Sequence, residues 1–471
     1  LGGLLRVNAL CAGTLFVAMV FLFAWAVVPR AWPAALAVTI GVLAASAEGT
    51  YILWRLFRTG GPLLAVRNLN IDAITMWFFK GLTIDGLPRS LWYTPQHAGA
   101  CSLGLVALLV LAGTGSRGGW PSRLLAGVAL GLSVATSPFL GGAFSLVYGV
   151  AVLVDAALDP RTLIPRAIGQ AWAAVPVLGA VAWAAAGGVL EGARGAVVVG
   201  FVGQARHAPV VTALLALGPL LLPGLVGLLV PGKGRREAIP AAAGLGVGLL
   251  LFYFVSVAKT DPVWVGWRAG QIMLVTLPAL AARLFAWAWD RPGLRRMAGA
   301  GVLLALLIGL PTTVIDTYNA QDVTNRDMGA GFPWTVRVSP DEQAAFAWLR
   351  RATPRDAVVQ PDAVTRGRAS WTHIPAFAER RMAAGLPISL VAMPYREEAA
   401  SRVHSLFGTT DARAAWETAR DLGIDYLYVD LVERGAFPPA ALSKFDDHAE
   451  WFVPAFRNRT VVVYAVTRPA L

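Results

Sequence analysis

The chain has 471 residues, of which 56% are hydrophobic and only 14% are charged. A soluble domain has about 25% charged residues, so this composition excludes an ordinary soluble enzyme and also a disordered chain. The two cysteines, Cys11 and Cys101, both lie in apolar stretches, which excludes a disulfide scaffold and a thiolate zinc site.

The excess positive charge is confined to the first two thirds of the chain. Residues 1–316 carry the whole net charge of +12, whereas residues 317–471 contain equal numbers of basic and acidic residues. In the first part the basic residues fall in short loops between apolar segments. That pattern is typical of membrane topology, and it argues against a nucleic-acid partner.

Ten apolar segments approach the roughly 20 residues that a helix needs to cross a bilayer. They lie at 8–28, 32–56, 97–114, 122–137, 140–156, 167–190, 208–230, 238–258, 267–289 and 297–316. Glycine runs such as 244–248 lie inside these segments, where small residues favour close packing of helices. The predicted fold class is therefore membrane all-α, a bundle of about ten transmembrane helices over residues 1–316 with a long outer loop at 57–96.

The loops between these segments differ in charge from one side to the other. One alternating set is short and basic, which marks the cytoplasmic side. Its basic residues are Arg30, Arg117, Arg123, Arg161, Arg166, Lys233, Arg235, Arg236, Arg291, Arg295 and Arg296. We expect the other set, which includes 57–96, 191–207, 259–266 and everything after 316, to face outward. The N-terminus then also lies outside, so we expect at least one further helix upstream of Leu1.

The long outer loop carries most of the candidate site. Its residues 71–80 are amphipathic and rich in aromatic side chains, which predicts a short helix lying in the membrane interface. The polar residues of the loop and of its end are Asp72, Lys80, Asp85, Arg89, Gln96 and His97. They are either solvated charges beside an aromatic belt, or a site in which a carboxylate acts as a base or metal ligand and the cations hold a phosphate.

The outer loop at 259–266 offers a second group of charges. Lys259 and Asp261 precede Arg268, which falls in the first turn of a predicted spanning helix. A cation is costly there, because both the helix dipole and the bilayer disfavour it. Arg268 either snorkels outward, or it flanks an anionic group such as a lipid phosphate together with Lys259, with Asp261 in an ordered turn beside it.

After residue 316 the composition becomes that of a globular domain. Residues 317–338 predict a linker, and residues 339–471 predict a small extracytoplasmic α/β domain. Ser339-Pro340 followed by two acids is a helix start, 411–421 predicts a second helix, and 357–360, 423–430 and 461–466 predict strands. Polar residues gather at 373–381 and at 430–434. Each group is either a binding site or an ordinary network of surface ion pairs.

Several segments resemble the GT-C superfamily of polytopic membrane glycosyltransferases. They are the loop end at 92–97, the stretch 131–138 and, in the outer domain, 346–350, 378–381 and 422–429. The resemblance implies an extracytoplasmic active site, a polyprenyl-phosphate-type sugar donor, a glycan, lipid or protein acceptor, and inversion at the anomeric carbon. It also implies a multi-pass protein of the bacterial inner (cytoplasmic) membrane with its C-terminal domain on the periplasmic side.

One departure from that superfamily affects the site. Its members place an acidic residue in the first outer loop, which here would begin upstream of Leu1. The residues present therefore suggest Asp72 or Asp85 as the catalytic carboxylate, assisted by His97. The expected substrate-binding residues are Lys80, Arg89, Gln96, Lys259, Asp261 and Arg268. A divalent ion, Mg²⁺ or Mn²⁺, is the candidate cofactor.

The leading hypothesis is thus an integral-membrane glycosyltransferase, and two alternatives stay open. A membrane transporter or lipid flippase predicts charges buried at mid-membrane and two related halves, whereas the apolar segments hold little charge besides Glu48 and show no internal repeat. A non-catalytic membrane-anchored sensing or binding protein would only display the α/β domain, for which one helix suffices.

Overall fold

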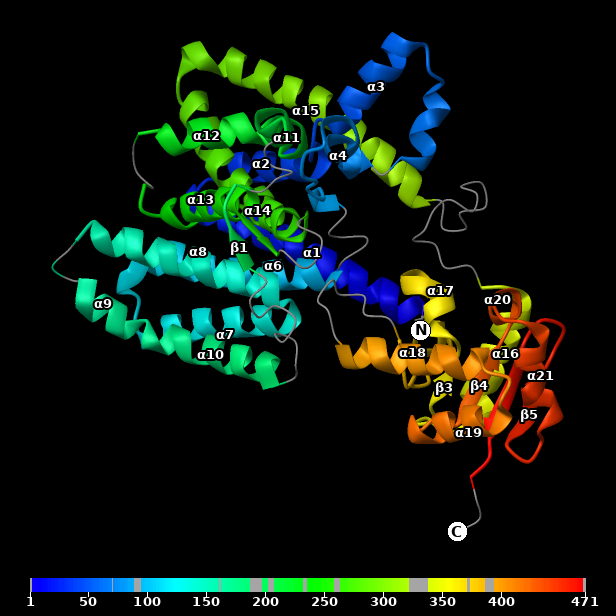
Figure 1. The fold of residues 1–471 in the computed structure, drawn as a ribbon. Coiled ribbons are helices and arrows are strands. Elements are labelled where there is room, and N and C mark those ends of the chain that lie inside the picture. The colour runs from blue at the N-terminus through cyan, green and yellow to red at the C-terminus, as the bar shows by residue number, and fades with distance from the viewer. Residues whose placement is uncertain are drawn as a thin grey trace. The chain divides into compact units, whose positions relative to one another are not determined.

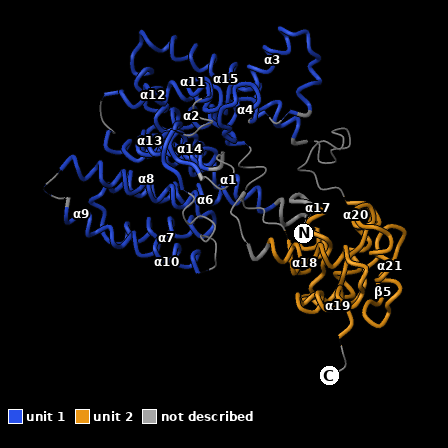
Figure 2. Tube along the Cα trace, in the orientation of Figure 1, with its two compact units in different colours: residues 1–324 blue, residues 325–471 orange. Residues whose placement is uncertain are grey.

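A computed structural model describes most of the chain, and the chain divides into two compact units. The described residues are 2–69, 71–88, 95–159, 161, 163–186, 197–201, 207–231, 235–257, 263–321, 338–370, 373–385 and 394–468. Unit 1 comprises residues 1–324 and unit 2 residues 325–471 (Figure 2). Unit 1 is almost entirely helical, and unit 2 combines helices with a small sheet (Figure 1).

Unit 1 is built from helices of very different lengths. They are α1 (Gly2–Val27), α2 (Ala31–Leu43), α3 (Glu48–Thr59), η1 (Leu63–Asn68), η2 (Ile71–Ala73), α4 (Ile74–Phe79), α6 (Pro95–Thr114), η3 (Gly115–Arg117), α7 (Trp120–Thr136), α8 (Pro138–Ala157), α9 (Leu163–Gly169), α10 (Ala171–Ala186), α11 (Pro209–Ala216), η7 (Gly218–Leu220), α12 (Leu221–Leu229), α13 (Ile239–Phe254), α14 (Val263–Trp289) and α15 (Pro292–Gln321). Two short strands, β1 (Val197–Val199) and β2 (Val255–Val257), pair antiparallel.

The prediction of ten membrane-spanning helices is wrong in number. Among the described residues, five helices are long and apolar enough to cross a membrane, and seven spans result if each of two bent helix pairs counts as one. The chain is still a multi-pass membrane protein. The predicted segments at 122–137, 167–190 and 238–258 contain helices α7, α10 and α13, which have only 16 or 17 residues each. Composition shows which residues are apolar, but it does not show where a helix ends. In the segment 238–258, for example, the helix ends before strand β2.

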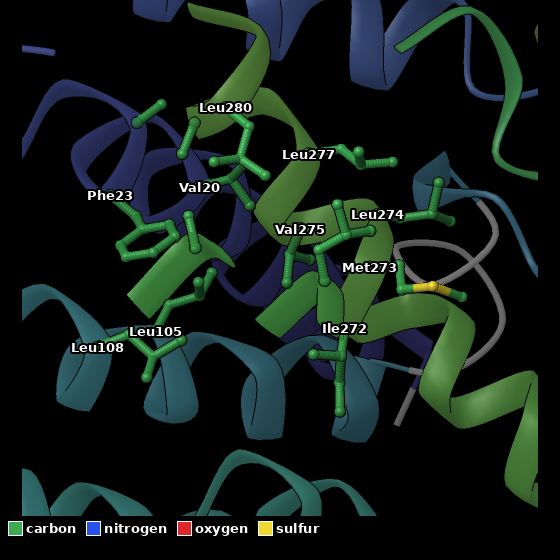
Figure 3. Close-up of a cluster of buried hydrophobic side chains, with 14 of the residues drawn as sticks. Val20, Phe23, Leu105, Leu108, Ile272, Met273, Leu274, Val275, Leu277 and Leu280 are labelled. Atoms are coloured by element: carbon green, nitrogen blue, oxygen red, sulfur yellow. The ribbon is translucent and has the colours of Figure 1, made fainter. Parts of the chain in front are cut away.

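Helix α14 is the centre of unit 1. It packs against α1, α2, α12 and α13. Its residues 272–280 meet Val20 and Phe23 of α1 and Leu105 and Leu108 of α6 (Figure 3). A helix that is apolar on every side is expected in such a central position. Because lipid tails are as apolar as leucine, close packing holds helices together in a bilayer more than the hydrophobic effect does.

Glycines on α12 and α13 allow this close packing. A Cβ atom at Gly227 would lie 2.0 Å from the carbonyl oxygen of Leu280, and one at Gly244 would lie 2.5 Å from Cγ2 of Thr276. Neither distance is possible between real atoms, so these positions accept no side chain without a shift of the helices. In the glycine run at 244–248, Gly244 and Gly248 therefore serve helix packing, as predicted, whereas a Cβ atom at Gly246 would meet no neighbour.

Two bent helix pairs meet at their breaks. The axis turns by 46° between α2 and α3 and by 106° between α11 and α12. The backbone N–H of Ala47 donates to the carbonyl of Leu215 at 2.8 Å. Helix α15 closes the junction, because the Thr312 hydroxyl accepts from the N–H of Gly49 at 2.8 Å and donates to the carbonyl of Ser46 at 2.8 Å. Backbone groups that the breaks leave open are thus satisfied inside the protein, as an apolar surrounding requires.

The predicted outer loop at 57–96 is only partly a surface loop. The helix predicted at 71–80 is present as η2 and α4. The segment 81–88, by contrast, is buried along its whole length, and we call it the inserted segment. Glu48, itself fully buried, accepts the N–H of Thr75 at 3.0 Å, and the Thr75 hydroxyl donates to the carbonyl of Leu82 at 3.1 Å. The break at α3 therefore holds the start of the inserted segment.

Unit 2 is a mixed four-stranded sheet covered by helices. Its strands are β3 (Val359–Gln360), β4 (Tyr426–Val429), β5 (Phe452–Arg457) and β6 (Val462–Val466), in the order β3-β4-β6-β5. Strands β3 and β4 are parallel, and the other neighbours are antiparallel. Its helices are α16 (Pro340–Ala352), α17 (Ala363–Ser370), η9 (Ile374–Ala378), α18 (Pro394–Gly408), α19 (Ala412–Asp421), α20 (Leu431–Ala436) and α21 (Pro439–Asp447).

The local signals in unit 2 are largely confirmed. Ser339 caps α16 and forms a capping box with Glu342, and Asp411 caps α19, the second predicted helix. The three predicted strands exist as β3, β4 and β6. Strand β5 was not predicted, because its exposed residues and Pro454 hide the alternation of a half-buried strand. Helix α15 continues to Gln321, past the predicted end of the membrane domain at 316.

We predict that Glu48→Ala destabilises the full chain by about 1–3 kcal/mol, because the buried N–H of Thr75 loses its acceptor. Glu48→Gln keeps an oxygen at that position and should lose less. Thermal unfolding in detergent measures both, with Glu417→Ala at an exposed position as the control. Equal stability of Glu48→Ala and the control would contradict the role of Glu48.

Candidate functional site

Three predicted site residues come together inside unit 1. Asp85 lies in the inserted segment, His97 near the start of α6 and Arg268 in the second turn of α14. The Arg268 guanidinium interacts electrostatically with the Asp85 carboxylate and with the His97 ring. Asp85 is 7% exposed and Arg268 is 6% exposed. Arg268 therefore does not snorkel to water. It lies in the interior, beside a residue of opposite charge.

Two glycines of α14 set this arrangement. A Cβ atom at Gly270 would lie 2.6 Å from Cγ2 of Ile84, and one at Gly266 would lie 3.0 Å from Cδ1 of Leu82. The missing side chains let the inserted segment lie directly against α14, on the two turns that also carry Arg268. Asp85 follows Ile84, so the close approach brings its carboxylate within electrostatic range of the guanidinium. A buried cation inside a membrane is costly unless it is paired.

Further polar groups surround the pair. Gln271, 1% exposed, follows Arg268 by one helical turn. Cys101 follows His97 by one turn and also interacts electrostatically with Arg268. Within the described part of the chain, Nδ1 of His97 is buried and has no hydrogen-bond partner, so it could bind a ligand. Sequence reasoning missed Gln271, although a glutamine inside an otherwise apolar helix is a signal that could have found it.

The other predicted site residues do not join this group. Lys80 is exposed and ends α4 in the left-handed conformation, with φ of 54°. Gln96 is exposed beside His97. The backbone of Asp72 lies in η2, but its side chain is outside the described residues, as are the whole of Arg89, Lys259 and Asp261. The site that can be described is therefore Asp85, His97 and Arg268.

A divalent cation does not fit this site as far as it is described. No group of three or more His, Cys, Asp or Glu residues that could hold a metal ion occurs among the residues whose placement is described. The pair of Asp85 and His97 offers two donors only. Arg268 lies beside both and would repel a second cation. We therefore derive no chemical step through a metal.

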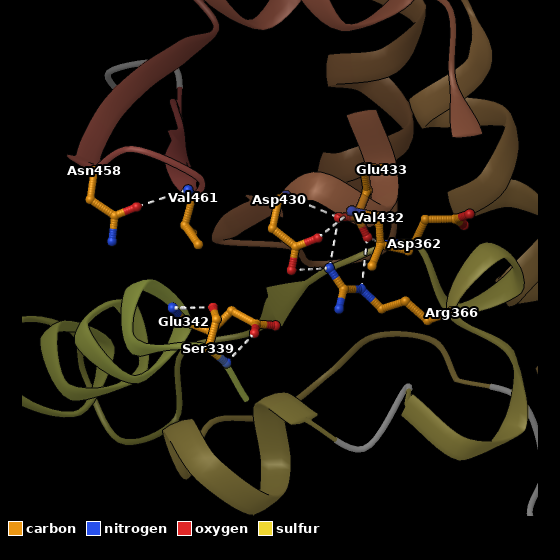
Figure 4. Close-up of polar contacts among 9 residues, drawn as sticks. All are labelled: Ser339, Glu342, Asp362, Arg366, Asp430, Val432, Glu433, Asn458 and Val461. Carbon is orange, nitrogen blue, oxygen red and sulfur yellow. Dashed lines mark hydrogen bonds and ion pairs between the residues drawn. The ribbon is translucent and has the colours of Figure 1, made fainter. Parts of the chain in front are cut away.

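Unit 2 contains a separate cluster of buried charges (Figure 4). Arg366 of α17 donates to both carboxylate oxygens of Glu433, at 2.8 and 2.7 Å, and pairs with Asp430 at 2.7 Å. Glu433 also accepts the backbone N–H groups of Asp362 and Asp430. Asp362 and Asp430 follow the parallel strands β3 and β4, so the cluster ties together the ends of these strands.

The two polar groups predicted in the outer domain are thus only partly at the surface: His373, Arg380, Asp430 and Glu433 are buried, whereas Glu379, Arg381 and Arg434 are exposed. Burial raises the pKa of Glu433 to about 7 against the opposing effect of Arg366. Burial also opposes ionisation of Asp430, but Arg366 outweighs it and holds the pKa of Asp430 below its usual value. Arg380 has a structural role, because it donates to the carbonyls of Arg350 and Thr353 at the end of α16, both at 2.8 Å.

His373 is the unusual member of this region. It is buried next to the rings of Phe346 and Phe377, and neither of its ring nitrogens has a hydrogen-bond partner within the described structure. Burial, together with the charge of Arg366, lowers the pKa of His373 to about 4. The folded state therefore holds this ring neutral.

Comparison with known proteins adds little to this picture. No family model matches the chain, and no curated protein matches it. Among solved structures, the chain is similar to the oligosaccharyltransferase of Archaeoglobus fulgidus, solved with a tethered acceptor peptide, with a TM-score of 0.39 and 14% identity over 98% of this chain. The chain spans 63% of the length of that protein. A similarity this low carries no argument about chemistry.

We predict a pH effect on stability from His373. Its pKa is about 6.5 when unfolded and about 4 when folded, so the unfolded state binds more protons between these values. The contribution of His373 to the free energy of unfolding should therefore fall as the pH falls from 6.5 towards 4, by about 2 kcal/mol at pH 5.

The variant His373→Phe isolates this effect, because Glu433 titrates in both proteins. Chemical unfolding of the full chain is measured at pH 7.5 and pH 5, and the change in the free energy of unfolding on acidification should be less favourable for the wild type than for the variant. The same change in both proteins would show that His373 does not titrate in this way.

Proposed function

We propose that the chain is an integral-membrane glycosyltransferase that transfers a sugar from a polyprenyl-phosphate-type lipid donor to an extracytoplasmic acceptor, with inversion. The observation that carries this proposal is that Asp85 and Arg268 are both buried inside a multi-pass helical unit, where the charge of Arg268 acts on Asp85 and on His97. A carboxylate, a guanidinium and an imidazole are the groups that such a transfer needs. The acceptor can be a glycan, a lipid or a protein.

The proposed reaction is a displacement at the anomeric carbon. The acceptor hydroxyl gives its proton to the Asp85 carboxylate while its oxygen forms a bond to the anomeric carbon. The bond between that carbon and the phosphate oxygen breaks on the opposite face, and the electron pair leaves with the lipid phosphate. Proton transfer to a positioned carboxylate typically contributes a factor of about 10²–10⁴ to the rate.

In this proposal Arg268 holds the leaving phosphate. Its planar guanidinium can bind two phosphate oxygens at once, and His97 adds a hydrogen bond through its unpartnered ring nitrogen. Binding of the phosphate neutralises the charge that faces Asp85, which makes the carboxylate a better proton acceptor. The same proposal keeps the predicted roles of the remaining residues: Asp72 as the alternative base, and Lys80, Arg89, Gln96, Lys259 and Asp261 as contacts to the donor.

The proposed location is the bacterial inner membrane, with the site and unit 2 on the outer side. The basic loops support this orientation, since short loops rich in arginine stay on the cytoplasmic side. The inserted segment belongs to the opposite set of loops. A lipid-linked donor would then enter from the bilayer, and its sugar would meet an acceptor outside the cell membrane.

We predict that Asp85→Asn lowers sugar transfer about 10²–10⁴-fold, because the amide cannot accept the proton. The measurement is transfer of labelled sugar from a polyprenyl-phosphate donor by the full chain in bacterial membranes. Asp290→Asn is the matched control, since Asp290 is half exposed and pairs with Arg30. The proposal fails if Asp85→Asn retains full transfer activity while the wild type is active.

A second candidate function, transport or flipping of a lipid-linked substrate, is favoured by one observation. Glu48 is fully buried where two bent helix pairs meet. Broken helices around a buried charge form the binding sites of many transporters. Glycosyl transfer gives a role to Asp85, His97 and Arg268, whereas transport gives a role to the buried charge of Glu48.

Reconstituted vesicles distinguish the two functions. If the chain is a flippase, movement of a labelled polyprenyl-phosphate sugar between leaflets should depend on the chain, should fall in Glu48→Gln and should persist in Asp85→Asn. If the chain is a glycosyltransferase, the vesicles should show transfer to an acceptor without such movement, and Asp85→Asn should lower the rate of that transfer by the factor given above.

A further inference from the structure

A polar cavity of about 200 Å³ lies in unit 1, away from Asp85, His97 and Arg268. It forms where the end of α6, η3, α8 and the turn before α13 meet. Its charged lining residues are two cations, Arg117 and Arg236, and two acids, Asp155 and Glu237. Apolar residues such as Leu111 and Ile239 form the rest of the wall. The cavity is therefore amphipathic.

The inner wall of the cavity is fixed by hydrogen bonds. Asp155 is 7% exposed and accepts both the N–H and the hydroxyl of Ser116, at 2.9 and 2.5 Å. Arg166 donates to the carbonyl of Asp155 at 3.3 Å and pairs with Asp159 at 2.9 Å. Arg117 pairs with the same Asp159 at 3.1 Å. A wall built in this way keeps its shape without a ligand.

Of the two cations that line the cavity, Arg236 is the one whose side chain can bind a ligand, because Arg117 pairs with Asp159. Arg236 is exposed on the turn before α13, and its charge acts on Asp155. The Arg236 side chain makes no hydrogen bond or ion pair with another residue in the described parts of the chain, and only its backbone carbonyl is engaged, by the N–H of Ile239 at 3.0 Å. A guanidinium at the mouth of a cavity, with its donors open, is suited to a phosphate group.

The cavity lies among the loops that the charge pattern predicts to be cytoplasmic. These loops contact one another, because Arg30 pairs with Asp290 at 2.6 Å and Arg117 pairs with Asp159. The charge pattern predicts that all of them lie on one side of unit 1. At the edge of a membrane, a cavity that is apolar on one wall and charged on the other faces the boundary between lipid tails and headgroups.

We propose that this cavity binds the headgroup of a membrane phospholipid. The phosphate lies between Arg117 and Arg236, and the end of the headgroup that carries hydrogen-bond donors, an ammonium or hydroxyl groups, lies at Asp155 and Glu237. The two acids disfavour a simple phosphate ion, whereas a phosphodiester with donor groups satisfies both signs of charge. The proposal does not depend on glycosyl transfer.

The test compares phospholipids that differ only in the headgroup. The purified full chain is incubated with micelles that contain phosphatidylethanolamine, phosphatidylglycerol or phosphatidylcholine, and bound lipid is counted by native mass spectrometry. The first two headgroups carry donors, whereas the quaternary ammonium of phosphatidylcholine carries none. We expect retention of the first two and not of phosphatidylcholine. Equal retention of all three would overturn the proposal.

Two variants and one control locate the site. Arg236→Gln should weaken retention of both donor-bearing lipids roughly ten-fold, the value of one charge-assisted hydrogen bond. Glu237→Gln should reduce their preference over phosphatidylcholine. Arg296→Gln removes the same charge from an exposed position on the same side and outside the cavity, and it should have no effect. Equal effects of Arg236→Gln and Arg296→Gln would contradict the proposal.

Soluble glycerol phosphate separates a lipid site from a site for free phosphate esters. It offers the phosphate and the hydroxyls without the tails. If the cavity serves a membrane lipid, millimolar glycerol phosphate should leave the bound phospholipid in place. Displacement of the lipid at that concentration would assign the cavity to a soluble phosphate ester and would overturn the lipid assignment.

Discussion

The structure of unit 1 depends on one charge, that of Arg268 in the central helix. A buried arginine inside an apolar bundle is costly unless a partner of opposite charge lies beside it. The inserted segment supplies that partner as Asp85. Gly266 and Gly270 make the contact possible, because their missing side chains let the segment lie against α14. Helix packing and the position of the charged groups are thus parts of one arrangement.

The same arrangement connects the fold to the proposed chemistry. Glu48 accepts a hydrogen bond from Thr75, which in turn donates to Leu82 at the start of the inserted segment. Helix α14 packs against the segment itself. Loops on a rigid scaffold are common positions for catalytic groups. Here the loop is buried, so its carboxylate lies away from bulk water. Interactions between charges are stronger in the protein interior than in water. A lipid phosphate that displaced Asp85 from Arg268 would meet a guanidinium that is already in position.

The sequence predicted the local structure well and the tertiary structure poorly. Capping at Ser339 and Asp411 depends on neighbouring residues, so the helix starts were found. The number of spans was wrong, because α7, α10 and α13 are shorter than a membrane-spanning helix although the sequence around each of them is apolar. Asp85, His97 and Arg268 were each singled out, but their pairing across 183 positions of sequence, from Asp85 to Arg268, needed the fold. Gln271 and His373 were missed or left ambiguous, since only burial distinguishes them from ordinary polar residues.

A double-mutant cycle on Asp85 and Arg268 tests the central claim most directly. The free energy of unfolding is measured for the full chain, for Asp85→Asn, for Arg268→Met and for the double variant. Removing one partner of a buried pair typically costs about 3–5 kcal/mol, so each single variant should be destabilised strongly and the double variant should be little worse than either. If the two costs simply add, the residues do not interact, and the arrangement of the site described above is wrong.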